Sequence, residues 1–367
     1  MADARGTRRS GPRFGATNPA PPCSVSSARV GEYRLRAGMA EKRLPSFGWL
    51  VLVLLSATVA RAAGEASKAG EGVPRLQHVF VIIEENMGFD EVATTHAGEA
   101  PYLNALAAAH VRHEAYYAIT HPSLGNYTAL VSGQPPSPLE QRNCPLYNNC
   151  IRVGPTLADQ LTTKGLTWRG YFESMPVPCA RPTGFWDDYQ HGYATRHNPF
   201  VYFQEIVRDE AYCQTHVVPY EKHFAADLEA GPPNFAFIVP NTCNDGHDTG
   251  CKVGKTALEV LDGWLEDNVP PILKFVYENP GSALVITFDE AESSDGAACC
   301  KQRSARGGGH IDFVLIAPGL ERAPGHRSRV PANHYSLLRT LEEAFGLAPL
   351  GEAAHVEPMK DLFASAP

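Results

Sequence analysis

Ser123 lies in a position where its hydroxyl could act as a nucleophile. It follows Pro122 and precedes residues 124–131, whose sequence predicts a short helix. The start of a helix offers free N–H groups and a positive potential to an anion, which suits a serine that accepts a phosphoryl group. The same pattern also fits an ordinary capped turn. Whether Ser123 is a nucleophile therefore depends on which side chains other segments bring to it.

Three apolar segments end in acidic, amide or imidazole side chains. Their near-continuous apolar content predicts strands buried in a parallel sheet, and the carboxyl ends of such strands form the ligand-binding edge of open α/β folds. Residues 76–83 precede Glu84, Glu85 and Asn86, residues 234–239 precede Asp245, His247 and Asp248, and residues 283–288 precede Asp289 and Glu290. Three such endings favour a common site over three unrelated solvated turns.

The side chains at these strand ends are typical ligands of a divalent cation. Carboxylate and amide oxygens suit a hard ion, and we expect Glu85, Asn86, Asp289 and Glu290 to hold it. The ion would favour the alkoxide form of Ser123 and offset negative charge on phosphoryl oxygens. The sequence leaves open which metal binds and whether one ion binds or two.

Two histidines are the candidate catalytic imidazoles. His247 follows a predicted strand, and His310 follows three glycines, residues 307–309, which would let the backbone come close to a ligand. Either imidazole could bind phosphoryl oxygens or protonate the leaving group. Four other histidines are interpreted as surface or core residues: His191, His197, His216 and His223.

Predicted strands and helices alternate along residues 76–345. Helices are expected over residues 101–113, 124–131, 156–164, 220–229, 256–268 and 333–345, and further strands over 166–172 and 311–317. This alternation favours an α/β fold, a three-layer sandwich in which helices cover both faces of a mostly parallel central sheet. We expect one such domain, over residues 63–367.

Residues 1–62 are expected to be an N-terminal extension that ends in a signal peptide. Basic residues after Met39, an apolar run over residues 48–60 and small residues up to Ala62 match a signal that is cleaved near Ala62. The run is shorter than the roughly 20 residues of a membrane-spanning helix. This predicts a secreted or periplasmic protein, with Met39 as a candidate true start; a retained N-terminal anchor is the alternative.

The cysteine content agrees with export. Eight of the nine cysteines follow residue 62, and an even number in an exported chain predicts disulfides. Proximity in the sequence favours the pairs Cys144–Cys150 and Cys243–Cys251, although eight cysteines allow many pairings.

The expected mature chain is acidic. Of the 32 basic and 40 acidic residues, 10 basic and 3 acidic ones lie in residues 1–62, which leaves 22 against 37 and a formal charge of −15. Broad attraction to nucleic acid or to an anionic membrane is therefore not expected. An anionic substrate would need a metal or a local group of cations, and no stable protein partner is predicted.

The motifs, taken in order, resemble the bacterial phosphoesterase family. They are HVFVIIEENMGFDEV, THPSLGNYTALVSG, PNTCNDGHD, FDE and GGGHIDFVLIAPG, and the resemblance spans about residues 78–347. That family belongs to the alkaline phosphatase superfamily and contains phospholipase C enzymes and secreted acid phosphatases. The resemblance is closest to the acid phosphatase branch, which includes enzymes that dephosphorylate phosphatidylinositol 3-phosphate.

The resemblance implies an alkaline-phosphatase-like fold and a phosphoserine intermediate at Ser123. It implies that Ser123 joins the four residues named above as a metal ligand, and we expect His121, Asn126 and Asp248 to contact the substrate. Phosphoesters, including phospholipid headgroups, are the expected substrates. Asp248 could instead orient an imidazole.

The sequence leaves alternatives to a secreted phosphomonoesterase. One is a phospholipase C-like phosphodiesterase, although Gly125 and Tyr127 depart from the pattern of that branch. Another is an inactive secreted binding protein of the same fold. A serine esterase is disfavoured because His121 stands where the nucleophile elbow requires glycine.

Overall fold

The described residues all belong to one structural unit of the chain. The computed structural model describes residues 72–144, 150–181, 192–300 and 306–364, and all of these belong to the second of two units of the chain, which begins at Ala63. The expected signal peptide, its cleavage near Ala62 and the start at Met39 lie outside the described residues. Within them, no helix is long and apolar enough to cross a membrane.

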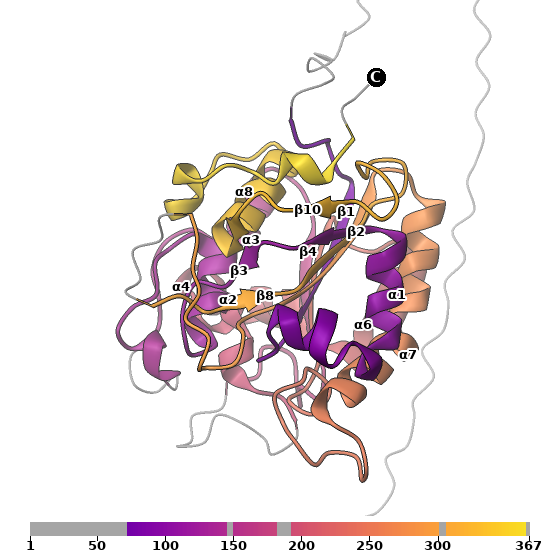
Figure 1. Ribbon diagram of the computed structural model, residues 1–367. Helices are drawn as coiled ribbons and strands as arrows, with labels where there is room; N and C mark the ends of the chain where they lie inside the picture. Colours follow the sequence, from indigo (N-terminus) through magenta and orange to yellow (C-terminus); the bar gives the residue numbers. More distant parts are fainter. Residues whose placement is uncertain (1–71, 145–149, 182–191, 301–305, 365–367) are drawn as a thin grey trace, which may run out of the picture. The chain divides into compact units, whose positions relative to one another are not determined.

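An eight-stranded sheet forms the centre of the second unit (Figure 1). Its order is β10-β2-β9-β7-β1-β6-β4-β5, and within this sheet β9 alone runs antiparallel to its neighbours. The strands are β1 (His78–Glu84), β2 (Val111–His113), β4 (Trp168–Phe172), β5 (Val217–Pro219), β6 (Phe235–Val239), β7 (Ser282–Phe288), β9 (Phe313–Ile316) and β10 (Arg327–Ser328). A smaller sheet contains β11 (Ala332–Asn333), β3 (Tyr116–Tyr117) and β8 (His310–Ile311).

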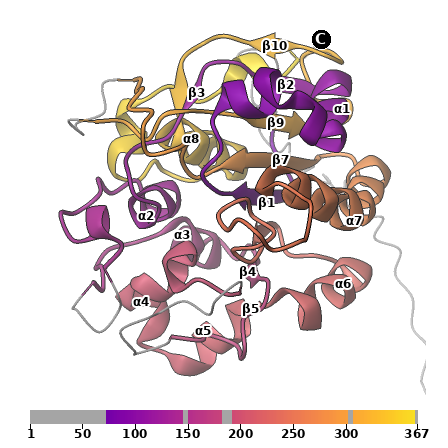
Figure 2. The same ribbon diagram turned by 60° about the horizontal axis from the view of Figure 1, so that its bottom comes forward.

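Helices cover both faces of the large sheet (Figure 2). On one face lie α1 (Pro101–Ala109), α6 (Tyr220–Ala230) and α7 (Ala257–Glu278), and on the other lie α2 (Leu124–Ser132), α3 (Leu157–Thr163) and α8 (His334–Phe345). Two shorter helices are α4 (Gln204–Val207) and α5 (Glu210–His216). The predicted three-layer α/β sandwich with a mostly parallel sheet is confirmed.

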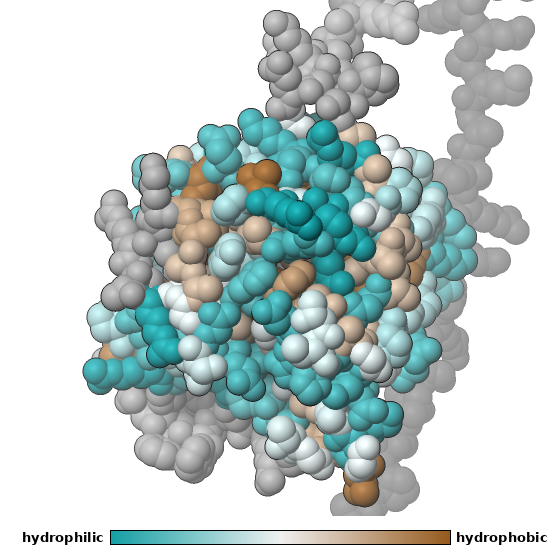
Figure 3. Space-filling view, in the orientation of Figure 1, coloured by the Kyte–Doolittle hydropathy of each residue, from teal (hydrophilic) through white to brown (hydrophobic). Residues whose placement is uncertain are grey.

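The central strand β1 explains why this sequence forms a parallel sheet. It lies between β7 and β6, and its residues Val79 to Glu84 are almost fully buried. Because helices cover both faces, alternation of apolar and polar residues is not required, and a continuous apolar strand is favoured. Hydrophilic residues predominate on the molecular face in Figure 3, where apolar residues occur in small groups.

Two predicted helix boundaries are wrong. The helix expected to reach residue 113 ends at Ala109, because Val111–His113 instead pairs with β9 and β10 as β2. The helix expected to end at residue 268 continues through Pro270 and Pro271 to Glu278. Burial of Ile272 and Val276 on the apolar face of α7 outweighs the usual helix-breaking effect of proline.

Four disulfides are present in the described chain. The two predicted pairs, Cys144–Cys150 and Cys243–Cys251, are confirmed. Cys179–Cys213 and the adjacent pair Cys299–Cys300 complete the set. Such extensive pairing is typical of proteins in oxidising compartments.

Glu342 on α8 is a buried carboxyl group. Its side chain has no solvent exposure, and Oε1 accepts a hydrogen bond from the Leu350 N–H at 2.7 Å. Oε2 has no hydrogen-bond partner among the described residues. Burial raises the pKa of Glu342 to about 8, so the carboxyl group is neutral at pH 7 in the folded protein.

We expect Glu342→Gln to change how stability depends on pH. The unfolded chain loses its proton near pH 4.5 and the folded chain near pH 8, so the wild-type free energy of unfolding falls as pH rises between these values. Glutamine does not ionise. The Tm of the variant relative to wild type should therefore increase steadily in thermal melts from pH 5 to pH 8. The exposed change Glu357→Gln is the control, and a Tm difference that does not change with pH would contradict the assignment.

Candidate active site

The carboxyl ends of β1 and β7 bring three buried carboxylates together. The two strands pair in parallel up to Glu84 opposite Phe288, and the Asp289 N–H donates to the Glu84 carbonyl at 2.9 Å. The residues that follow therefore emerge side by side at one sheet edge. Glu85, Asp289 and Glu290 each place one oxygen within 4.8 Å of the others. These are three of the four predicted metal ligands.

Mutual repulsion affects the protonation of this cluster. Burial, followed by the charges of Glu85 and Glu290, raises the pKa of Asp289 well above its usual range. Burial also raises the pKa of Glu290. Although burial acts in the same direction on Glu85, the neighbouring His197 holds its pKa down at about 2. Without further positive charge, the three carboxylates are not all stable in the ionised form.

The cluster fits a divalent cation. Asp289 Oδ2 is buried and has no hydrogen-bond partner among the described residues, which is costly unless another partner is present. An all-oxygen donor set of this charge suits a hard divalent ion. Glu85, Asp289 and Glu290, with the Ser123 hydroxyl, are the residues that would hold it.

Asn86, the fourth predicted ligand, lies beside this cluster. It adopts a left-handed backbone conformation with φ 57°, which asparagine tolerates better than most residues. Its N–H lies 3.4 Å from Asp289 Oδ1, to which it donates. Its ligation of a metal stays a prediction.

Ser123 faces the carboxylate cluster. It occupies the N-cap position of α2, yet its side chain makes no capping hydrogen bond. Instead its Oγ donates to Glu85 Oε2 at 3.2 Å. The hydroxyl belongs to a residue that is only 2% exposed, and it is therefore held against a candidate metal ligand.

Asn126 fixes the backbone that leads to Ser123. Its Oδ1 accepts the N–H groups of Ile119 and Thr120 at 2.9 and 3.0 Å. Its Nδ2 donates to the Thr120 carbonyl at 2.8 Å and to Glu290 Oε2 at 3.3 Å. The amide thus joins the nucleophile segment to the cluster, and its predicted contact with substrate stays a prediction.

The glycines before His310 support the same backbone. A Cβ at Gly308 would lie only 2.5 Å from the Thr120 carbonyl oxygen, so a larger residue would displace the segment that leads to Ser123. The Gly308 N–H donates to the Ala118 carbonyl, and the Ala118 N–H donates to the Gly309 carbonyl. The close approach that these glycines permit is to protein backbone.

His121 contacts the cluster from the side of Ser123. Its Nδ1 lies 2.9 Å from Glu290 Oε2, and its Nε2 donates to the Asp295 carbonyl at 2.6 Å. Burial opposes the charged ring, but these two acceptors raise the pKa of His121 overall. In this arrangement its ring faces Glu290, and the predicted substrate contact stays a prediction.

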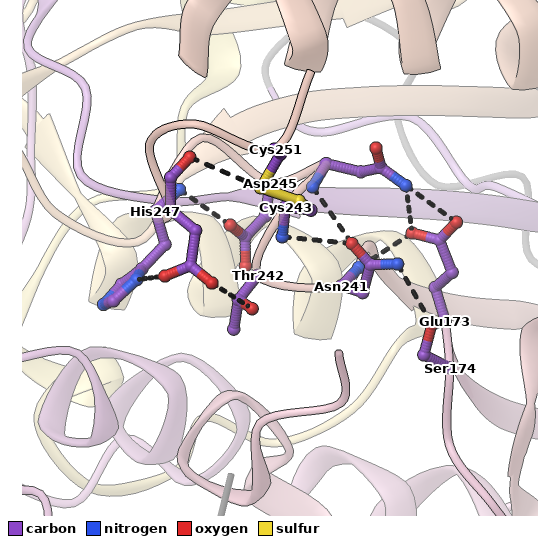
Figure 4. The surroundings of a disulfide bond; sticks show 10 residues. Glu173, Ser174, Asn241, Thr242, Cys243, Asp245, His247 and Cys251 are labelled. Carbon is purple, nitrogen blue, oxygen red and sulfur yellow. Dashed lines mark hydrogen bonds and ion pairs between the residues drawn. A yellow bond between two sulfur atoms is a disulfide. The ribbon is translucent and has the colours of Figure 1, made fainter. Parts of the chain in front are cut away.

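His247 and Asp248 form an oriented pair after β6 (Figure 4). His247 Nδ1 lies 2.8 Å from Asp248 Oδ1, and Asp248 Oδ2 accepts a hydrogen bond from Thr242 Oγ1. His247 Nε2 lies 3.0 Å from an Arg196 guanidinium nitrogen. Because arginine only donates, Nε2 accepts in this contact. Asp248 thus orients His247, one of the roles left open by the sequence.

His310 lies apart from this group. Its ring stacks between Phe89, at 4.5 Å, and Tyr117, at 5.0 Å between ring centroids. Its Nε2 donates to the Glu114 carbonyl at 3.0 Å. Among the described residues it makes no contact with Ser123 or the three carboxylates, and its predicted catalytic role stays a prediction.

Sequence reasoning missed the contribution of His197. The residue lies in the 3-10 turn Thr195–His197 and is almost fully buried. Its Nε2 is 2.6 Å from Glu85 Oε1, although not aligned as a hydrogen bond, and its Nδ1 is 3.1 Å from Asp245 Oδ2. A ring between two carboxylates is a cation, and these acids raise its pKa against the effect of burial. No strand precedes His197 closely, so the strand-end pattern did not reveal it.

A cavity of about 730 Å³ opens over the site. Ser123, Asn86, His247 and Glu290 all line it, so the three predicted strand ends and the nucleophile segment share one cavity. Met87, Pro122 and Leu258 add apolar surface. A volume of this order accommodates a small-molecule substrate.

Comparisons with known proteins agree with this geometry. A model of the phosphoesterase family matches residues 92–348. The chain is 28% identical to a phosphatidylinositol-3-phosphatase of Mycobacterium tuberculosis, over 88% of this chain and 94% of the relative. It is also 28% identical to a probable acid phosphatase of Kluyveromyces lactis, over 81% of this chain, and spans 64% of that relative, less than two thirds of its length.

The fold has a counterpart among solved structures. A protein of the alkaline phosphatase superfamily from Vibrio parahaemolyticus superposes with a TM-score of 0.50, at 12% identity, over 80% of this chain and 73% of its own. The likeness concerns the fold alone and confirms the predicted alkaline-phosphatase-like architecture.

We expect divalent cations to stabilise the protein through the carboxylate cluster. A cation at one hundred times its Kd adds about 2.7 kcal/mol to the free energy of unfolding, so the Tm of metal-free wild type should rise by several degrees on titration. Asp289→Asn should abolish most of this rise. The metal-free variant should also melt above metal-free wild type, because asparagine removes a buried carboxyl group whose ionisation burial and the neighbouring carboxylates oppose. Asp267→Asn, an exposed change on α7, is the control, and an equal cation response in all three proteins would contradict the site.

Proposed function

We propose a function from one premise: this chain belongs to the phosphoesterase family. We infer that it is a metal-assisted phosphoric monoester hydrolase that acts through a phosphoserine at Ser123. The observation that carries this proposal is the placement of Ser123 Oγ, 3.2 Å from Glu85 within a buried three-carboxylate cluster that fits a divalent cation. When bound, a divalent cation would favour the serine alkoxide and offset charge on the phosphoryl oxygens.

Ser123 Oγ attacks the phosphorus of the substrate. A bond forms between this oxygen and phosphorus, and the bond from phosphorus to the leaving oxygen breaks. Glu85 Oε2, which accepts the Ser123 hydrogen bond, orients the hydroxyl for this attack and takes its proton, which returns to Ser123 Oγ when the serine is later released. Water then attacks phosphorus, the bond to Ser123 breaks, and inorganic phosphate leaves.

His247 is the residue that supplies a proton to the leaving oxygen. Its Nδ1 is held by Asp248, so Nε2 must take up a proton from solvent and then pass that proton to the leaving oxygen. In the observed state Nε2 accepts from Arg196. Arg196 must therefore turn toward a bound phosphoryl group before His247 can donate. Substrate binding thus breaks the contact between Arg196 and His247 and frees Nε2 of His247.

The relatives favour acid phosphatase activity for this chain. The two relatives described above are named for acid phosphatase and phosphatidylinositol-3-phosphatase activities, so soluble monoesters and phosphoinositide headgroups are the candidate substrates. Four disulfides support action outside the cytoplasm, in a secreted or periplasmic setting.

We expect Ser123→Ala to abolish phosphate release. The variant loses the attacking oxygen, and removal of a nucleophile reduces turnover by several orders of magnitude. Release of phosphate from an aryl phosphate, with thermal melts to confirm folding, is the measurement. Ser293→Ala, an exposed serine of the same cavity, should retain activity. Turnover of Ser123→Ala near the wild-type level would exclude the mechanism.

A monoesterase and a phospholipase C-like phosphodiesterase differ in substrate. We expect the protein to release phosphate from an aryl phosphate and to leave a choline phospholipid intact, because Ser123 must attack a terminal phosphoryl group. Product analysis with both substrates, in wild type and Ser123→Ala, checks this. Cleavage of the phospholipid alone would establish the phosphodiesterase. If both substrates are cleaved only at a background rate that does not depend on Ser123, the result would favour the inactive binding protein.

A further inference from the structure

Around the mouth of the active-site cavity, the basic side chains have ion-pair partners, whereas two of the acidic side chains have none among the described residues. Besides His247, which Asp248 holds, two basic side chains contribute to the lining, and both already have acidic partners. His96 Nδ1 lies 2.8 Å from Glu99 Oε1, and Lys255 Nζ lies 2.9 Å from Glu259 Oε1. Neither base is available to a substrate anion without breaking an ion pair.

Glu91 and Glu292 line the same cavity and have no ion-pair partner among the described residues. Glu91 begins the π-helical turn Glu91–Thr95, which follows the β1 strand end, and Glu292 comes two residues after Glu290. Both therefore lie beside the candidate metal ligands. The charge of Glu292, after the effect of burial, raises the pKa of Glu91, which places the two carboxylates within electrostatic range of each other.

A buried carboxyl group behind the lining residues Asn86 and Glu290 provides a second, independent observation. Asp289 is 1% exposed, and its Oδ2 has no partner among the described residues. Its other oxygen accepts from Asn86 and Glu290, both of which line the cavity. A cation would offset the charge of these buried carboxylates and of a bound phosphoryl group. The two glutamates at the mouth would remain uncompensated.

We propose that Glu91 and Glu292 select phosphomonoesters whose leaving group carries a positive charge. This inference rests on the proposed monoesterase function and names its substrate class. An ammonium group on the leaving alcohol would lie at the mouth, where the two carboxylates attract it. A carboxylate or second phosphate there would meet like charge. Of the two candidate substrates named under the proposed function, this selection favours soluble monoesters over phosphatidylinositol 3-phosphate, whose leaving group carries a phosphodiester anion.

Three kinds of alkyl phosphate separate the effect of leaving-group charge from the chemistry. Phosphoethanolamine and phosphocholine have cationic leaving groups, glycerol 3-phosphate a neutral one, and 3-phosphoglycerate an anionic one. We expect kcat/KM of the metal-loaded wild type to fall in that order. The preference for cationic over anionic substrates should be roughly tenfold or more at low salt and should shrink as salt screens the charges.

The double variant Glu91→Gln with Glu292→Gln should reduce this preference about tenfold. Most of the change should appear in KM, since the glutamates do not touch the reacting atoms. Glu91→Asp with Glu292→Asp keeps the charges and should keep the preference. Glu229→Gln, an exposed change on α6 outside the cavity, controls for net charge.

Failure of this inference is distinguishable from failure of the proposed function. Ser123-dependent hydrolysis of glycerol 3-phosphate, with a charge preference that is absent in wild type or unchanged in the double glutamine variant, would overturn the selection role alone. No Ser123-dependent hydrolysis of any of these monoesters would overturn both. Matched thermal melts ensure that a lost preference does not reflect misfolding.

Discussion

The repulsion among three buried carboxylates is the constraint on which the site depends. Glu85 and Asp289 follow neighbouring parallel strands that end at the same level, and Glu290 adds a third acid. Water cannot solvate them, so compensation must come from the protein or from a cation. His197 provides one positive charge, and His121 another at Glu290. The remaining negative charge makes the cluster suited to a divalent ion.

The nucleophile is positioned by contacts with this cluster more than by its own helix. The Ser123 side chain does not cap α2 but faces Glu85, and the Leu124 N–H at the helix start donates instead to Asn143 Oδ1. Asn126, one turn along α2, contacts Glu290 and holds the preceding backbone. The helix therefore presents both residues to the carboxylates as a rigid unit. A displacement of either strand end would also move the acceptor of the serine hydroxyl.

The sequence predicted the parts of the site that follow directly from strand periodicity. Apolar runs located β1, β6 and β7, and parallel pairing placed Glu85, Asp289 and His247 around one site. His197 could not be found this way, because it lies in an irregular segment and reaches Glu85 through tertiary packing alone. The glycines before His310 accommodate the Thr120 carbonyl, a backbone contact that the sequence did not reveal, and the predicted catalytic role of His310 stays untested. The end of α7 was misplaced because burial of its apolar face overrides the local effect of two prolines.

Glu85 and Asp289 differ in the direction of their pKa shifts, and this difference affects how the cluster would hold a cation. Metal ligands must be deprotonated, so affinity falls when a carboxyl group retains its proton. The pKa of Glu85 is held at about 2 by His197, whereas burial raises that of Asp289. Glu85 is therefore the ligand already ionised before a cation arrives, and Asp289 must lose its proton on binding. By keeping Glu85 ionised, His197 preserves one anionic ligand and the acceptor of the Ser123 hydroxyl even in mildly acidic solution. An otherwise costly buried imidazolium thus serves both the stability of the cluster and the orientation of the nucleophile.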